Sequence, residues 1–397
     1  MNLSNANINK CSFFKCKIEG ITNIEGAEFG SFSLTNCIFD EYFFFSGSKI
    51  SSVNFNFENC LFKKETRFQK IEIKKSNGIK YGESVLSFRH CKFGESINIT
   101  DVLLNGNSLS FEDCSINGIN VKGVEWESRA ITFENCTISG ISVFHFQEKS
   151  DNKINELTFW STTILGQVHI EGFDIKKIMI GFSVIDQKAR IRLHENLILN
   201  LYIVECSIFG LLDLESGFVK NMDFTGSVCD GIINVNHSKY DVLENIYTVR
   251  LLKTQAHKLN DMISYLKLYH CEMVAYEKEL KWNNPDKYML LLNRISNNYG
   301  QSWVRGIFFI LSMAFLSLCL INSIGTTDSL LVDFSKNGLS FILNEVISIL
   351  NVFNIISLNE GFVNMNVFGV IIFFISRILI LYGGYQTIIA FRRFNRK

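Results

Sequence analysis

Thiols, imidazoles and carboxylates could do chemistry in this chain, and the eleven cysteines are the most unusual of these groups. Closely paired cysteines would form disulfides or redox couples, and Cys/His clusters with regular spacing would bind zinc. The sequence contains no CxxC pair and no cluster with zinc spacing. We therefore predict no metal site, no cofactor and no catalytic residue, and we expect the thiols to be free and reduced.

Most of the cysteines recur in one pattern, apolar-x-x-Cys-x-apolar-x-Gly-x-apolar-x-apolar, at intervals of about 20 to 31 residues. Alternating apolar residues predict strands, and the glycine predicts a tight corner. Each copy would be one coil of a solenoid over residues 1–240, whose thiols face inward for packing alone. The repeated position holds Cys16, Cys37, Cys60, Cys91, Cys114, Cys136, Thr162, Phe182, Cys206 and Ser227.

Residues 8–238 resemble the pentapeptide-repeat proteins and their right-handed β-helix relatives, on segments such as FFKCKIEGI and FENCTISGISV. The resemblance implies a parallel β-helix. Longer insertions after Phe62 and Phe144 interrupt the five-residue frame, so we expect an irregular coil. Some soluble members of that family mimic duplex DNA, which requires a strongly negative surface. The formal net charge of zero argues against mimicry and against a nucleic acid partner.

Residues 241–300 predict a helical linker or cap, because the apolar spacing changes to seven over Val249–Lys281. Asn283, Asn284 and the single proline, Pro285, end this predicted helix, and a shorter helix follows up to Gly300. The apolar seam either caps the open end of the solenoid or pairs with the same helix of another subunit. The seam consists of Leu252, Leu259, Leu266, Met273 and Leu280.

Residues 301–397 predict a membrane domain with spans at about 303–324 and 367–391. Basic residues flank the outer ends of both spans, which favours cytoplasmic N- and C-termini and an even number of crossings. Residues 340–357 therefore predict a re-entrant or interfacial helix rather than a third span. The first residues lack a basic start followed by an apolar run, so we expect no secretory signal and place the protein in the inner, cytoplasmic membrane.

The order of span, re-entrant helix, span and basic tail resembles the two-helix pore module of ion channels, although no TVGYG-like filter is present. Arg377 lies near the middle of the second span, where a charge must face protein or water. We predict a homo-oligomer in which Arg377 meets Glu345 or lines an aqueous path. Gly383 and Gly384 would allow close helix approach nearby.

The sequence predicts two classes of function and no enzyme, because no nucleophile–base constellation or phosphate-binding loop is recognisable. The first is an oligomeric membrane protein whose cytoplasmic solenoid senses a partner and whose helices conduct ions or perturb the membrane, as in bacterial defence. The second is a passive scaffold, in which the solenoid binds a protein and the helices only anchor it in lipid.

Overall fold

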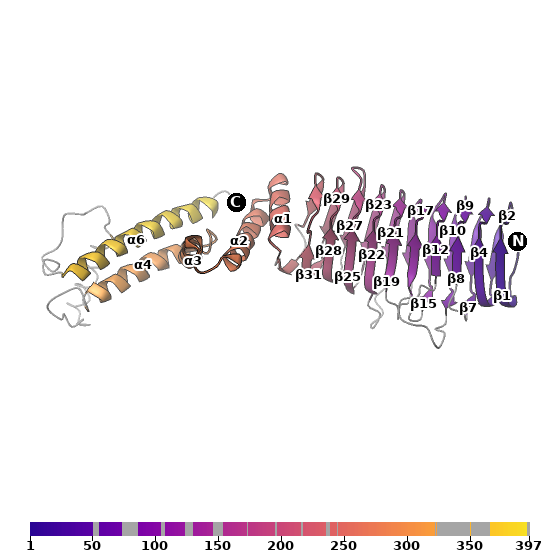
Figure 1. The fold of residues 1–397 in the computed structure, drawn as a ribbon, viewed down its shortest axis with the longest axis horizontal. Helices are drawn as coiled ribbons and strands as arrows, with labels where there is room; N and C mark the ends of the chain where they lie inside the picture. The colour runs from indigo at the N-terminus through magenta and orange to yellow at the C-terminus, as the bar shows by residue number, and fades with distance from the viewer. Residues whose placement is uncertain are drawn as a thin grey trace. The chain divides into compact units, whose positions relative to one another are not determined.

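The computed structural model describes residues 1–50, 55–73, 86–104, 108–123, 130–145, 154–172, 174–194, 197–215, 217–235, 239–243, 245–321, 323, 350 and 366–394. The chain forms two compact units, Met1–Lys258 and Leu259–Lys397. The first is a parallel β-solenoid followed by one helix, and the second is helical, as Figure 1 shows. The predicted fold class is confirmed.

In the described part of the chain, to which all strand numbers below refer, three parallel sheets form the sides of the solenoid. Sheet 1 has fourteen strands: β1 (Asn7–Phe14), β4 (Glu28–Thr35), β7 (Lys49–Ile50), β8 (Phe55–Glu58), β11 (Glu72–Ile73), β12 (Leu86–Arg89), β15 (Leu103–Leu104), β16 (Leu109–Glu112), β19 (Ala130–Glu134), β22 (Ile154–Trp160), β25 (Asp174–Gly181), β28 (Leu197–Val204), β31 (Phe218–Asp223) and β34 (Lys239–Val242). Strands inside this sheet pair in parallel with neighbours from the coils before and after them, as in β12, which pairs with β8 and β16.

Sheets 2 and 3 have ten strands each. Sheet 2 contains β3 (Thr22–Glu25), β6 (Phe43–Ser46), β10 (Thr66–Gln69), β14 (Ile97–Thr100), β18 (Ile119–Lys122), β21 (Ile141–His145), β24 (Gln167–Glu171), β27 (Arg190–His194), β30 (Leu211–Glu215) and β33 (Ile232–Asn234). Sheet 3 contains two-residue strands: β2 (Lys17–Ile18), β5 (Ile38–Phe39), β9 (Leu61–Phe62), β13 (Lys92–Phe93), β17 (Ser115–Ile116), β20 (Thr137–Ile138), β23 (Thr163–Ile164), β26 (Val184–Ile185), β29 (Ser207–Ile208) and β32 (Val228–Cys229).

The corner between sheets 1 and 3 has the same conformation in successive coils. One residue adopts a left-handed backbone, with φ between about 49° and 69°, and at the corners from Lys15 to Glu205 its amide donates to a carbonyl in the following coil. Polar residues that tolerate this conformation hold most of these corners. The corner residues are Lys15, Asn36, Asn59, His90, Asp113, Asn135, Ser161, Phe182, Glu205 and Gly226.

The residue after this corner occupies the inward slot of the repeat, and its side chain donates hydrogen bonds to backbone carbonyls. The Cys114 thiol donates to the carbonyls of Phe88 and Glu112, at 3.4 and 3.3 Å. Thr162 and Ser183 make equivalent bonds through their hydroxyls. The assignment of Phe182 to this slot is wrong. Its φ of 50° puts it at the corner with an exposed ring, and Ser183 fills the slot.

A column of phenylalanines fills the interior of the solenoid. Phe88, Phe111, Phe133 and Phe159 stack in consecutive coils, with ring centroids 4.9 to 5.0 Å apart and nearly parallel planes. Stacked aromatic pairs contribute beyond the area they bury, so each ring stabilises its two neighbouring coils. Burial also raises the pKa of the slot thiols Cys37 and Cys206, which keeps them protonated as packing groups.

Helix α1 (Ile246–Lys258) closes the C-terminal end of the solenoid. Val249 and Leu252 on this helix are fully buried. Thr248 Oγ1 accepts from the Phe224 amide at 2.9 Å, and Gln255 accepts from the Ile233 amide at 3.4 Å. The side chains of α1 thus satisfy backbone groups that a further coil would otherwise bind, so the exposed edge is capped.

The second unit contains α2 (Met262–Glu279), α3 (Pro285–Asn297), α4 (Trp303–Leu320) and α6 (Val367–Phe394). The predicted continuous helix over Val249–Lys281 is wrong. Asn260 adopts φ 57°, and the Asp261 carboxylate caps α2 by accepting from the Ile263 and Ser264 amides. The local capping bonds therefore outweigh the seven-residue spacing.

Candidate functional site

Helices α4 and α6 pack as an antiparallel pair (Figure 1). A Cβ atom on Gly306 would lie 2.2 Å from Thr387 Oγ1, and one on Gly383 would lie 2.8 Å from Ile310. Small residues at these positions let the two backbones approach closely. By contrast, a Cβ on Gly384 would have no atom within 4 Å, so the predicted pair of glycines divides into one contact residue and one open position.

The packed face continues along the pair as a small apolar core. Ala314 and Ile321 are fully buried there, and Phe373 and Ile380 are nearly so. The outer faces are different, because only 22% of the α4 span and 33% of the α6 span is buried. Both helices are long and apolar enough to cross a membrane, with mean hydropathies of 2.0 and 2.2. A mostly exposed apolar surface of this size is unlike the core helix of a soluble protein.

Arg377 lies on α6 and is 8% exposed. Its guanidinium carbon lies 4.3 Å from the centroid of the Phe373 ring, one turn earlier on the same helix. A cation over an aromatic face is favourable, and more so away from water. Residues of the same chain therefore bury this charge and contact it. Its predicted partner Glu345 and the predicted re-entrant helix at 340–357 lie outside the described residues, apart from Leu350, which packs beside the apolar core.

A network of polar side chains joins α2 and α3 to α6, and we call it the polar junction. Tyr382 on α6 donates its hydroxyl to Asn293 Oδ1 at 2.6 Å. Asn297 Nδ2 donates to the backbone carbonyl and side-chain oxygen of Gln386, at 3.1 and 2.8 Å. Asn297 Oδ1 also accepts from the Gly300 amide at 2.9 Å, which fixes the turn between α3 and α4.

The α2 side of the polar junction is built around the buried carboxylate of Glu277. It accepts from Arg294 Nη1 at 3.2 Å and from the Tyr299 hydroxyl. Burial and the hydrogen bond to Glu277 raise the pKa of Tyr299, so its proton stays on the phenol. The ring of His270 lies 5.5 Å from that of Tyr299. Burial, with the nearby Arg294 and Arg305 charges, lowers the pKa of His270 and keeps its imidazole neutral near pH 7.

The predicted seam residues are divided between the two units. Leu252 is buried on α1 in the first unit, where that helix caps the solenoid. Leu266 is buried on α2, and its carbonyl accepts from Gln301 Nε2 at 2.6 Å. The remaining three, Leu259, Met273 and Leu280, are half-buried in the second unit.

No family model, curated protein or solved structure matches this chain. The function is therefore inferred from the geometry of its two units.

The outer face of sheet 2 carries rows of titratable side chains. His145 Nδ1 lies 3.6 Å from a Glu171 carboxylate oxygen, and His194 Nδ1 lies 3.7 Å from Glu215, in register along consecutive strands. Arg192 lies 3.6 Å from the same Glu215 carboxylate. Such exposed pairs contribute little stability each, but their regular spacing gives this face a defined pattern of charge.

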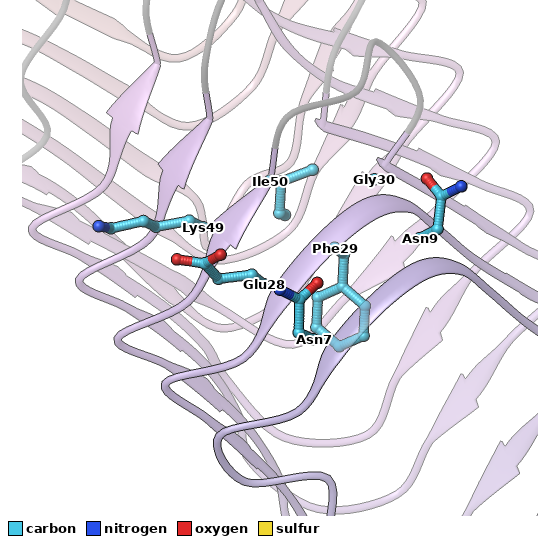
Figure 2. A pocket seen from close by; sticks show the side chains of 7 residues that line it. All are labelled: Asn7, Asn9, Glu28, Phe29, Gly30, Lys49 and Ile50. Atoms are coloured by element: carbon cyan, nitrogen blue, oxygen red, sulfur yellow. The ribbon is translucent and has the colours of Figure 1, made fainter.

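A hollow of about 290 Å³ lies on the first coils of the solenoid. Glu28 and Lys49 line it from neighbouring strands, with Asn7 and Asn9 on β1 (Figure 2). Its volume is at the lower end of small-molecule sites. Its polar side chains are exposed, so water competes for each of them.

Sequence reasoning missed the polar junction and Gly306. Asn293, Asn297, Tyr382 and Gln386 are polar residues within two separate predicted helices, and nothing in their spacing shows that they meet across 89 positions of the chain. Gly306 stands near the start of the first span, where a small residue could have been weighed as a contact position.

Proposed function

We propose that this protein is a membrane-anchored recognition protein. In this proposal α4 and α6 cross the cytoplasmic membrane as a hairpin, and the solenoid binds a protein partner in the cytoplasm. The observation that carries it is the antiparallel helix pair whose inner face is packed and whose outer face is apolar and exposed. We assign no catalytic reaction and no nucleic acid partner to it.

The antiparallel arrangement supports the proposed orientation. Trp303 at the start of α4 lies beside Phe391 at the end of α6, with ring centroids 6.4 Å apart, so the outer ends of both helices share one level. Arg305 and Arg392 are exposed at this same level. Aromatic rings favour the membrane interface, and basic residues favour its cytoplasmic side.

The solenoid supplies the recognition surface in this proposal. Its core is filled by stacked rings and its C-terminal edge is capped by α1, so the outer rows are presented on a rigid support. The row of His145, Glu171, His194 and Glu215 offers alternating donors and acceptors at strand spacing. This pattern suits a polar protein surface better than an apolar ligand.

Exchange of the membrane segment tests the recognition role. Residues 301–397 are replaced by an unrelated two-helix anchor, and a photo-crosslinking amino acid replaces Arg192 in both proteins. Recognition by the solenoid predicts the same crosslinked partner from both. A matched crosslinker at Lys17, on the outer face of sheet 3, is the control. Loss of the crosslinked partner when the native helices are replaced contradicts the proposal. Equal crosslinking from positions 192 and 17 also contradicts it.

The second candidate function is an effector, in which several hairpins assemble around an aqueous path that conducts ions or perturbs the membrane, as in bacterial defence. Two observations favour it: the buried charge of Arg377 within the apolar pair, and the polar junction, which links α6 to α2. A passive anchor requires neither. Ion flux through liposomes tests it, and Arg377→Met, which keeps the length of the side chain, should abolish the flux. The absence of ion flux through liposomes that contain the protein and the crosslinked partner would reject the effector function.

A further inference from the structure

Helix α3 has its polar and apolar faces reversed relative to an ordinary surface helix. Its asparagines point into the protein, where Asn293 and Asn297 bind Tyr382 and Gln386 of α6. Ser296, on the same side, is fully buried. A helix that buries amides against a neighbour must have its apolar side chains elsewhere.

The apolar side chains of α3 form a stripe at positions i, i+3, i+4 and i+7, on Tyr288, Leu291, Leu292 and Ile295. Tyr288 is 56% exposed and Ile295 is 57% exposed, and the two leucines are half-buried. In water this stripe would cost free energy for every exposed methylene. It faces neither α6, which binds the asparagines, nor α2, whose Glu277 binds Arg294.

Two features indicate what covers this stripe. First, α3 leads through a short turn into α4 and packs on both α4 and α6, whose outer faces are themselves apolar and exposed. Second, the flanking residues are those of a membrane interface. Trp282 is 66% exposed with the Lys287 ammonium 4.4 Å from its ring centroid, and Arg294 is also exposed. Amphipathic helices with aromatic and basic residues in this arrangement lie in the headgroup layer.

We propose that α3 is an interfacial helix, which lies in the cytoplasmic headgroup layer with Tyr288 and Ile295 at the boundary of the acyl chains. The occupant of the stripe is thus the lipid bilayer itself. The proposal rests on the membrane insertion of α4 and α6 and deepens it. It gives the polar junction a further role, because α3 would hold α2 at a fixed height above the bilayer through Arg294 and Glu277.

Depth-dependent quenching tests the placement. A fluorescent amino acid replaces Tyr288, Asp286 or Ile378 in the full chain, which is then reconstituted in phosphatidylcholine vesicles. Asp286 is exposed on the same helix but away from the stripe, and Ile378 is 64% exposed near the middle of α6. The quenchers are lipids with bromine near the headgroup end or near the far end of the acyl chain, and aqueous iodide.

We expect the Tyr288 probe to lose most of its emission to the shallow bromine, the Ile378 probe to the deep bromine, and the Asp286 probe to iodide. If the Tyr288 and Asp286 probes respond equally to iodide, α3 lies in water and the inference is wrong. If neither quencher reaches Tyr288, protein covers the stripe, such as a second copy of the chain, and the inference is again wrong. Both results leave membrane insertion intact as long as Ile378 responds to bromine. An Ile378 probe that no brominated lipid quenches rejects the proposed function itself.

Discussion

The two adjacent glycines of α6 give a matched test of how the helix pair is packed. Replacing Gly383 by alanine puts a methyl group 2.8 Å from Ile310 and 2.9 Å from Phe309, whereas the same change at Gly384 meets nothing within 4 Å. Both variants gain about 0.5–1 kcal/mol from the better helix propensity of alanine. Only Gly383→Ala has the additional cost of overpacking, about 1–3 kcal/mol. The two variants should therefore differ by about 1–3 kcal/mol in the free energy of docking α6 on α4.

Hydrogen exchange of α3 in detergent-solubilised protein measures this difference, because Tyr382 and Gln386 flank the glycines and hold α3 through Asn293 and Asn297. A difference of about 1–3 kcal/mol predicts amide exchange in α3 that is about 5- to 150-fold faster in Gly383→Ala than in Gly384→Ala. Equal exchange in the two variants, or faster exchange in Gly384→Ala, would refute the packing described above.

Three further predictions concern the solenoid core and the polar junction. Phe111→Ala removes a ring stacked between two others and should cost about 3–5 kcal/mol, seen as faster amide exchange in β12, β16 and β19 but not in β4; a uniform change over all coils would contradict nearest-neighbour stacking. Cys114→Ser keeps the donor that Ser183 provides in its own coil, so the free energy of unfolding should fall by no more than about 1 kcal/mol, with Cys114→Leu as the disruptive comparison. His270 has a lowered pKa when folded, so the junction should be fully stable above about pH 6.5 and lose stability as the pH falls below that value, because the unfolded chain binds the proton first. His270→Phe should remove this pH dependence of α3 exchange, and an unchanged profile would exclude His270 as its source.

The repeat in the sequence was sufficient to predict the solenoid, because inward side chains must recur once per coil and strands must alternate. The same reasoning failed at Phe182, where the spacing alone could not separate the corner residue from the slot after it. A phenylalanine with φ of 50° is an uncommon corner residue. Its ring packs against that of Trp160 in the preceding coil, with the ring centroids 4.7 Å apart. That contact depends on the stacking of coils, which a pattern read along one copy does not contain.

The two long apolar helices were predictable from hydropathy, whereas their contacts were only partly so. Gly383 was predicted as a position of close approach, and the structure places it at the contact with Phe309 and Ile310. The break at Asn260 was missed because a seven-residue apolar spacing continues through it, although the Asn-Asp pair is itself a capping signal. The polar junction depends on tertiary pairing between α3 and α6, for which a single sequence has no local signal.

Extraction of cell membranes with alkaline carbonate tests the central claim most directly, because this treatment releases peripheral proteins and leaves bilayer-spanning ones in the pellet. The full chain should stay in the membrane pellet. A chain that ends at Gly300 should be released into the supernatant. Quantitative release of the full chain into the carbonate supernatant would contradict the assignment of α4 and α6 as the membrane anchor.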